Sequence, residues 1–568
     1  SNGGKHGMYI DSSTGTNNGT IELTGNNKTG VYVNNGTFTN DGKIIINGTN
    51  GTGIKAVNNS TVKIGSYSEI ILNGENAVTQ ANTNFSTPNS NINSGGKAYD
   101  LDATSTLINP GTLRVKGAFR VQNQGRFILD TNTGKIEADS LLLDGNMYVN
   151  AEGSKNSSEN NYSFNNLNVN DVTGNGQVSS VSPLFSSKLT QNETGDYSIE
   201  LERKDFNDVF TGNLGSLLEN NYKNSENNEL QNNIYNSLKS IANENTLLTA
   251  ENELTGQSVI GNLNSHSFYQ DKILAKSVEQ LLDKRNSSTD TGFYINFLGS
   301  KTNSDEKDNT AAYERKSEGV MAGAMGQITD TLSLGAFIGY LNTDVNYKDS
   351  GESHQDLNTL SVKGALQKDI TDNLKFTGVV GYNNGTNSTN RKITYDNSNK
   401  EITGDFNSWS LGGEAKLEYT KKVNDTINIK PSITALLDYI SQDPYTETGP
   451  KEYILNVDGN KALSTKLGVG IKADIKAYEG KMGTLKVSPK INYLYEMGTP
   501  YEDRTAKLGG FNDNMDIFSV DPGRNDLNLG LDLEYNLNDK FLIYAEYNTG
   551  ILEDNKDQNI GIGAKFTF

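Results

Sequence analysis

The sequence predicts an all-β chain with three parts: an N-terminal parallel β-helix (solenoid) stem, an α-helical linker, and a C-terminal antiparallel β-barrel of twelve transmembrane strands. Three observations predict this fold class. A unit of about 23 residues recurs near the N-terminus, a helical period marks the middle of the chain, and apolar and polar residues alternate from Gly292 onward. We therefore expect the stem, with a C-terminal capping region, in residues 1–205, the linker in 206–291 and the barrel in 292–568.

The composition limits the chemistry that the chain can perform. Its 568 residues carry a net charge of -19 and include no cysteine. The acidic balance argues against a nucleic-acid partner, because no basic cluster is present to neutralise a row of phosphates. The lack of cysteine excludes thiolate metal sites, thiol nucleophiles and disulfides. No run of 18 or more apolar residues occurs, so no transmembrane helix is expected.

The first part of the chain contains a short repeat. Corresponding small residues are each followed by an apolar residue that starts a short strand, in the pairs Gly7-Met8, Gly30-Val31, Gly53-Ile54 and Ala77-Val78. Asn-Gly and Thr-Gly turn signals separate these strands from a second series with the sequences TIEL, KIII and EIIL. Strands this short cannot bury a face alone, so we expect them to stack as a parallel solenoid. The N-terminus opens within this pattern without a leader, and we expect a fragment or a processed form.

Residues 206–285 predict helices. Ile273, Leu274, Val278, Leu281 and Leu282 recur at steps of three and four, which places them on one face of a helix. Lys272, Lys276, Glu279 and Lys284 occupy the other faces. From this segment alone, an amphipathic helix packed on a soluble core is the better interpretation.

The second half contains twelve segments in which apolar residues occupy alternate positions. They cover residues 292–299, 319–328, 332–341, 360–368, 374–382, 408–419, 427–439, 463–474, 485–496, 526–536, 541–547 and 559–568. Lys and Arg are absent from the apolar positions, where one at the middle of a bilayer costs about 2 to 4 kcal/mol. Tyrosines gather at the segment ends, as in an interfacial aromatic girdle. These features favour a membrane barrel over a soluble sandwich.

The links between these segments alternate in length. Short links after every second segment alternate with long links at residues 299–317, 341–356, 383–405, 440–461 and 497–525. Short periplasmic turns and long outer loops are expected when every hairpin crosses the same membrane. In the last segment, NIGIGAKFTF, the residues Ile560, Ile562, Ala564, Phe566 and Phe568 are expected to face lipid, and the strand is expected to close the barrel by pairing with the first.

Three stretches of residues resemble a known family. The segment ENELTGQSVIGNLNSHSF, with Leu254, Thr255, Gly256 and Gln257, resembles the LSGE-type stretch that precedes the barrel in monomeric autotransporters of type V secretion. TGDYSIEL resembles the last strand of their passengers, and the ending Phe566-x-Phe568 resembles the C-terminal signal read by the barrel-assembly machinery. Thr255 and Gln257 depart from the usual Ser and Glu, and Gly561 stands where a polar residue is usual. The Asn/Gly-rich repeat resembles autotransporter adhesins.

The resemblance implies a function. The barrel would export and anchor its own N-terminal passenger, a cell-surface adhesin, in the outer membrane of a Gram-negative cell. The stem's C-terminal region would be autochaperone-like, and the helix from about residue 256 to 285 would lie in the lumen, which is wide enough for about one helix. Implied partners are outer-membrane lipid, the barrel-assembly machinery and an unidentified host or bacterial surface receptor, with the chain itself a monomer. Several members of the family cut off their passenger inside the pore, at an Asn-Asn pair in the helix. The nearest Asn-Asn pairs of this chain lie well before the barrel, so the passenger is expected to remain attached.

The resemblance and the pattern together give candidate site residues. The pore helix contributes Ile273, Lys276, Val278, Glu279 and Leu282; the acidic lumen positions are Glu414, Glu418, Asp532, Glu534 and Glu546; the C-terminal assembly signal is Gly563, Phe566 and Phe568. We expect the helix lysines to meet the lumen carboxylates, with Lys276 close enough to Asp532 for cross-linking.

Enzymatic interpretations have less support. His6, His266 and His354 are expected at solenoid edge, helix and outer loop, as isolated surface residues without a Ser or Asp arrangement nearby. No catalytic residue, cofactor or metal is therefore predicted. Two alternatives remain: the same translocator carrying an enzymatic, protease-type passenger beyond this sequence, and a porin-like channel with an extracellular solenoid.

Overall fold

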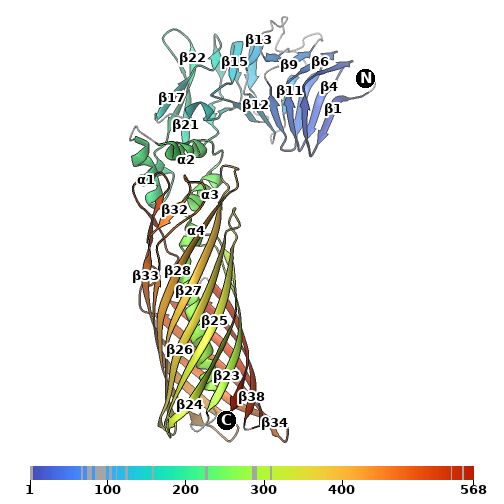
Figure 1. Ribbon diagram of the computed structural model, residues 1–568. Coiled ribbons are helices and arrows are strands. Elements are labelled where there is room, and N and C mark those ends of the chain that lie inside the picture. The colour runs from blue at the N-terminus through green and yellow to red at the C-terminus, as the bar shows by residue number, and fades with distance from the viewer. Residues whose placement is uncertain are drawn as a thin grey trace. The chain divides into compact units, whose positions relative to one another are not determined.

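The computed structural model describes the chain apart from residues 1–3, 66–67, 73–79, 83–96, 102–104, 110–111, 122–125, 156–158, 224–227, 285–290, 308–309, 539 and 553–554. The chain forms two compact units (Figure 1). One comprises Ser1–Thr211 and Leu218–Leu248, and the other comprises Gly212–Leu217 and Thr249–Phe568. The range 206–291, treated above as one helical linker, is therefore divided between the two units.

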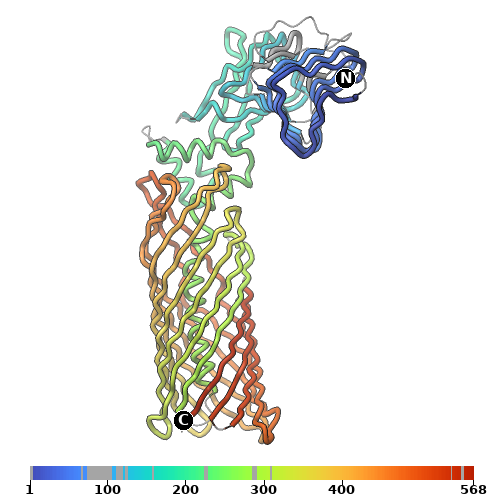
Figure 2. Tube along the Cα trace, turned by 45° about the vertical axis from the view of Figure 1, so that its right-hand side comes forward, coloured from blue at the N-terminus to red at the C-terminus, as the bar shows by residue number. Residues whose placement is uncertain are grey.

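Three sheets form the solenoid of the first unit, and Figure 2 shows their stacked coils. The first sheet contains β1 (His6–Asp11), β4 (Thr29–Asn34), β7 (Thr52–Val57) and β11 (Lys97–Leu101). The second contains β3 (Thr20–Thr24), β6 (Lys43–Asn47), β9 (Glu69–Leu72), β10 (Gln80–Asn82), β13 (Thr112–Val121), β15 (Lys135–Leu143), β18 (Leu167–Asn168) and β19 (Val172–Gly174). The third contains β2 (Thr14–Asn17), β5 (Thr37–Asn40), β8 (Thr61–Ile64), β12 (Thr106–Asn109), β14 (Arg126–Leu129), β16 (Met147–Val149) and β20 (Val178–Ser180). Met8 pairs with Val31 and Val31 with Ile54, which confirms the parallel repeat.

The fourth coil departs from the predicted spacing. Ala77 and Val78, where the repeat was expected to continue, lie outside the described residues. The residue that pairs with Ile54 is Tyr99 of β11. Between these coils, β10 runs antiparallel to both β9 and β13. An inserted segment therefore interrupts the repeat, and the stack then resumes in the same register.

Asparagine at the corners of the solenoid explains much of the unusual composition. Asn35 and Asn58 have positive φ angles of 48° and 57°. Asparagine enters this left-handed region more readily than other residues with a Cβ atom. Neighbouring coils are also linked by stacked side chains, since Asn34 Nδ2 donates to Asp11 Oδ1 at 2.7 Å and Asn58 Nδ2 donates to Asn34 Oδ1 at 2.6 Å. The Asn-rich stretches are thus part of an ordered stack.

An antiparallel sheet and helices follow the solenoid in the first unit. The sheet contains β17 (Asn161–Phe164), β22 (Tyr197–Arg203) and β21 (Phe185–Gln191). The other elements are η1 (Glu152–Ser154), η2 (Phe206–Asp208), α2 (Glu229–Lys239) and, from Leu218 onward, α1 (Gly212–Lys223), whose first half belongs to the second unit. Both Nη atoms of Arg203 donate to the Glu219 carboxylate at 2.8 Å, and both residues are buried. Lys239 Nζ donates to the Ser154 carbonyl at 2.9 Å. This antiparallel sheet and the helices beside it, called the cap below, therefore have a polar core in which Arg203 is paired with a carboxylate and Lys239 is hydrogen-bonded.

The second unit contains a closed barrel of twelve long strands, as the alternation predicts. They are β23 (Gly292–Ser304), β24 (Tyr313–Thr329), β25 (Leu332–Tyr347), β26 (His354–Thr371), β27 (Leu374–Ile393), β28 (Lys400–Tyr419), β30 (Ile427–Gln442), β33 (Asn460–Gly480), β34 (Gly483–Glu496), β37 (Asn525–Asn538), β38 (Phe541–Leu552) and β39 (Asn555–Thr567), with the short β29 (Lys421–Lys422) beside β30. The last strand pairs with the first, from Gly292 opposite Thr567 to Ser304 opposite Asn555. The barrel is therefore closed by the pairing that the C-terminal alternation predicts.

The outer face of the barrel is apolar in a belt and polar beyond it. Along β27 the outward residue Val380 is 67% exposed, Tyr382 marks the end of the belt, and the next outward residues, Asn384 and Thr386, are polar. The Trp409 ring lies 6.5 Å from the Tyr382 ring and 5.5 Å from the Tyr439 ring. This row of aromatic rings is placed as in the interfacial girdle of outer-membrane barrels.

The long links are more ordered than the sequence predicts. Residues 383–393 and 400–405 extend β27 and β28 as paired strands instead of forming a loop. Residues from two other long links form a separate four-stranded sheet of β31 (Tyr445–Thr446), β32 (Leu455–Val457), β35 (Arg504–Leu508) and β36 (Met515–Ile517). Leu455, Ala506 and Met515 are fully buried in it. Apolar residues within the links, counted above as loop, supply this small core.

Three further helices lie between α2 and the barrel in the chain: α3 (Glu244–Thr255), α4 (Gln257–Ile260) and α5 (Leu263–Asp283). Figure 1 shows α5 running along the inside of the barrel. Of the described helices, none has both the length and the apolar content needed to cross a bilayer.

Candidate functional site: the occupied barrel lumen

The apolar face of α5 packs against one side of the lumen. Ile273, Leu274, Val278, Leu281 and Leu282 share a buried cluster with Tyr294, Met321, Met325, Phe337 and Leu341 of the barrel. The predicted helical stripe therefore packs on the barrel wall. Burial of such side chains stabilises by roughly 1.5 to 3 kcal/mol each, so the cluster provides most of the helix's attachment.

The polar side of the same helix forms ion pairs with lumen residues. Lys272 Nζ lies 2.8 Å from Asp526 Oδ2, and Glu279 Oε1 lies 2.6 Å from Lys416 Nζ. Asp283 Oδ2 lies 3.1 Å from Lys472 Nζ. Pairs of this kind add little net stability because both ions lose water, but removing one partner leaves an uncompensated charge. They therefore fix the position of the helix more than they strengthen its binding.

The acidic lumen residues lie on the inner side of the barrel, and a lysine of the helix segment meets two of them. Asp532 and Glu534 are buried, and the lysine of the helix segment nearest to them is Lys284, at 3.6 Å and 3.1 Å. The expected contact of Lys276 with Asp532 is not among the described ion pairs. Lys284 follows the last turn of α5, so a helix lysine meets these carboxylates about two turns beyond Lys276.

The two predicted acidic positions on β28, Glu418 and Glu414, differ in burial. Glu418 is buried and lies 3.4 Å from Lys416 of its own strand and 3.6 Å from Lys430 of β30. Glu414 is half-buried beside the exposed Ala415, which places it on the lumen side.

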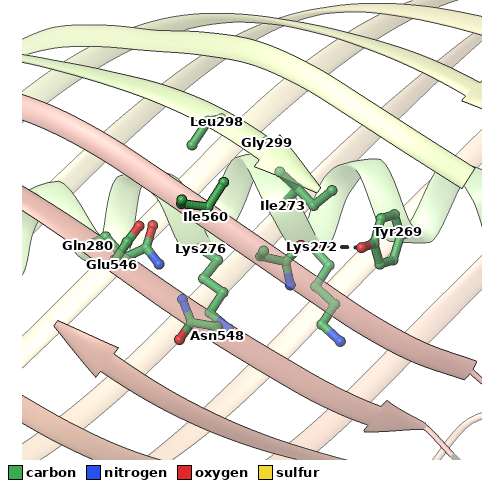
Figure 3. Close-up of a pocket in the computed structure, with 11 residues that line it drawn as sticks. Tyr269, Lys272, Ile273, Lys276, Gln280, Leu298, Gly299, Glu546, Asn548 and Ile560 are labelled. Atoms are coloured by element: carbon green, nitrogen blue, oxygen red, sulfur yellow. Dashed lines mark hydrogen bonds between the residues drawn. The ribbon is translucent and has the colours of Figure 1, made fainter. Parts of the chain in front are cut away.

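Lys276 borders a small cavity between α5 and the barrel (Figure 3). Glu546, Asn548 and Ile560 line its other side, and its volume is about 20 Å³. Glu546 is buried, and its Oε2 atom has no hydrogen-bond partner among the described residues. The space is sufficient for one water molecule between these polar groups.

His266 is fully buried and bonded in the lumen, which corrects the expectation of an isolated surface residue. Arg315 Nη1 donates to His266 Nδ1 at 3.0 Å, so His266 Nε2 carries the proton and donates to the Tyr347 hydroxyl at 2.8 Å. The Arg315 guanidinium also lies 3.3 Å from the centre of the Tyr269 ring. These residues are scattered along the sequence, and no spacing rule brings them together.

His354 is also placed differently from the predicted outer loop. It lies in β26, with Nε2 at 3.1 Å from Asp356 Oδ2 and Nδ1 at 3.7 Å from Asp344 Oδ1. One imidazole nitrogen of His354 and one carboxylate oxygen from each of Asp344 and Asp356 lie within 4.8 Å of one another. The carboxylates approach opposite edges of the imidazole, and all three side chains are partly exposed, as in a surface charge cluster.

The segment before α5 is held by the links at the barrel mouth. Gln257 bonds in both directions to the backbone of Phe518, donating to its carbonyl at 2.6 Å and accepting from its amide at 3.1 Å. Gly256 has a φ of +63°, and a Cβ atom there would lie 2.9 Å from Ile260 Cδ1. Glycine suits this position for both reasons. Glu253 accepts from the backbone amides of Thr394 and Tyr395.

The C-terminal strand presents its terminal aromatic rings outward. Phe566 is 45% exposed and Phe568 is 75% exposed, with ring centres 5.3 Å apart in an edge-to-face arrangement. Gly563 faces inward, where an added Cβ atom would lie 2.2 Å from the Tyr544 hydroxyl. The two rings are therefore accessible, and Gly563 makes room for a tyrosine.

Comparisons with known proteins gave one family match and several similar solved structures. Residues 293–548 match the autotransporter β-domain family. None of the curated proteins matches the sequence. The solved translocator domain of autotransporter NalP from Neisseria meningitidis is 14% identical, with a TM-score of 0.44, over 53% of this chain and 96% of that one. The β-domain of the Bordetella autotransporter Brka is 11% identical (TM-score 0.38; 49% and 100% covered), and the transport unit of autotransporter AIDA-I from Escherichia coli is 13% identical (TM-score 0.34; 50% and 92% covered).

Proposed function

We propose that the chain exports and anchors its own N-terminal solenoid as a cell-surface adhesin. The premise is that residues 293–548 match the autotransporter β-domain family, whose domain is a transport unit and not a catalyst. The β-domains of this family are outer-membrane barrels. The proposal places this barrel in the outer membrane of a Gram-negative cell, with the solenoid outside and still attached.

The observation that carries this proposal is the occupied lumen. α5 lies inside the barrel with an apolar face and an ion-paired face, so both halves of its surface have partners there. Its chain continues through α4 and α3 toward the solenoid residues. A segment held in this way is what a transported polypeptide leaves in its pore when transport ends and the passenger is not released.

The adhesin part of the proposal is supported by the outer surface of the solenoid. Tyr9 is 57% exposed, and its ring is stacked on that of Tyr32, with centres 5.3 Å apart and planes 2° from parallel. Lys55 follows in register on the next coil. Exposed stacked rings beside a positive charge form a contact surface for a receptor on a host or bacterial cell.

Epitope accessibility tests the export proposal. One tag is inserted at the exposed solenoid turn Asn26-Asn27, and a second, in a separate variant, at the short barrel turn Asp372-Asn373. In intact Gram-negative cells carrying the chain behind a secretion signal, an antibody should reach the first tag, and the second only after the outer membrane is opened. Access to both tags or to neither would contradict the proposal.

Ion conductance separates the proposal from a porin-like channel. The full chain, reconstituted in a planar bilayer, should conduct little, because α5 and its partners fill the lumen. A large and stable conductance would support the channel and oppose the proposal.

We also propose that the barrel-assembly machinery reads the exposed rings at the C-terminus. Phe568→Ala should lower the amount of heat-modifiable, folded barrel in the outer membrane several-fold. Ile562→Ala, also on the outer face of β39, is the matched control and should have a smaller effect. Equal effects would indicate a general loss of apolar surface instead.

A further inference from the structure

Three neighbouring strands of the barrel, β27, β28 and β30, place small residues in one line on the lipid-facing side, and the line ends at Leu467 of β33. β-sheet register aligns Gly378 with Ala415, Ala415 with Ala435, and Ala435 with Leu467. A second outward-facing row lies two residues further along these strands and consists of large residues, each paired with the next: Phe376, Leu417, Ile433, Val469 and Tyr493. A row of missing side chains beside a row of large ones leaves a trough in an otherwise convex surface.

The trough is a real hollow and almost wholly apolar. Its volume is about 580 Å³, within the range of small-molecule sites. Ala415 and Ala435 form its floor, and Ile433, which is 57% exposed, and Val469, which is 59% exposed, stand beside it. No charged side chain is among the described residues that line it. A hydrocarbon group is therefore the kind of occupant that suits this lining.

The shape of the trough favours a long and thin occupant. The residues that line it come from five neighbouring strands, β27, β28, β30, β33 and β34, which are spaced by about 4.8 Å, so the lining extends over about 19 Å. Barrel strands tilt by about 35 to 45° from the membrane normal, and a line at right angles to them therefore crosses the bilayer obliquely. Tyr493, whose hydroxyl donates to Asn525 Oδ1 at 2.5 Å, stands at one end, among the tyrosines of the belt edge.

We propose that this trough holds one acyl chain of an outer-membrane lipid as a bound ligand, distinct from the lipids that exchange freely around the barrel. The inference rests on the proposed function only in that the barrel lies in a membrane. The trough is continuous with the apolar belt that lipid covers, so an acyl chain reaches it without leaving the bilayer. A second copy of the chain is the competing occupant.

Native mass spectrometry of the full chain, extracted in mild detergent, tests the proposal. The unmodified protein should retain one lipid per barrel, and Ala435→Phe, which fills the floor, should reduce that fraction at least tenfold. Ala415→Leu is the second filling variant if Ala435→Phe does not fold. Ala545→Leu is the matched control, because Ala545 faces outward on β38 and does not line the trough; it should retain lipid as the unmodified protein does.

The outcomes are distinguishable from failure of the export proposal. Equal lipid retention by the filling and control variants would overturn the acyl-chain site, and so would a dimer that only the filling variants lose. Heat-modifiable mobility and surface access of the solenoid tag are measured on the same variants. If both stay normal while lipid retention falls, the site is supported; if the tag never reaches the surface in any variant, the proposed function fails and the lipid measurement still stands.

Discussion

The solenoid and the barrel both alternate apolar and polar side chains along their strands, but they turn the apolar set toward opposite surroundings. In the solenoid, Val31, Ile44 and Ile54 are fully buried between the sheets. In the barrel, Val380 and Ile562 are 67% and 55% exposed, while Asp532 and Lys565 face inward and are buried. The same alternation is therefore compatible with an apolar interior and with an apolar exterior. The connections between strands, together with the aromatic belt, indicate which of the two applies.

The largest expected effect comes from breaking the polar core of the first unit. Glu219→Ala leaves the Arg203 guanidinium buried without its carboxylate, which should lower the free energy of unfolding of this unit by about 3 to 5 kcal/mol. Denaturant unfolding followed by circular dichroism measures it. Glu200→Ala, at the exposed pair with Lys188, is the control and should leave the transition unchanged. A small effect at Glu219 would mean that water enters the cap.

The second effect tests the lipid-facing side of the barrel. Leu531→Arg places a charge on the outer belt, where it should cost about 2 to 4 kcal/mol in a reversible unfolding measurement in lipid vesicles. Thr386→Arg lies on the same outer face but beyond the aromatic row, and it should be nearly neutral. If both variants were equally stable, the apolar belt would not be in contact with lipid.

A third prediction concerns pH. Burial, with a smaller effect of the Arg203 charge, lowers the pKa of Lys239 to about 8. The unfolded chain therefore binds more protons than the folded one between about pH 8 and 10.4, and the stability of the cap should rise with pH in that window, by about 3 kcal/mol at most. Lys239→Met should remove this rise. A stability that falls through the same window in the unmodified protein would contradict the assignment.

The smallest expected effect concerns one solenoid corner. Asn35→Ala places a residue that avoids the left-handed region at a φ of 48°, which should cost about 1 kcal/mol. Asn35→Gly relieves the backbone and should be nearly neutral. Thermal unfolding of the two variants gives the comparison, and a Gly variant less stable than the Ala variant would show that the side chain matters more than the backbone.

The sequence predicts those features that local repetition encodes. The period of two and the alternation of short and long links were sufficient for twelve strands, and the steps of three and four in Ile273, Leu274 and Val278 were sufficient for a helical face. The inserted segment before Tyr99 and the sheet built from Leu455 and Met515 carry no repeat, and the sequence analysis missed both.

The contacts of the lumen were less predictable for a physical reason. A helix in a barrel can rotate and slide, and its position is fixed by single contacts between residues far apart in sequence. The bond of Arg315 to His266 and the pair of Lys284 with Glu534 are two such contacts. The charge pattern indicated that lysines meet acids, but it could not indicate that Lys284 lies nearer to Asp532 than Lys276 does.

The central claim is that α5 lies inside the barrel, and cysteine cross-linking in the intact outer membrane tests it most directly because the chain has no cysteine of its own. Ser277 Oγ accepts from Asn296 Nδ2 at 3.1 Å, so Ser277→Cys with Asn296→Cys should be joined by a short thiol cross-linker in nearly all folded molecules. Ser277→Cys with Ile295→Cys, the neighbouring position that faces outward, should not be joined. Cross-linking of the second pair but not the first, or of neither, would contradict the occupied lumen.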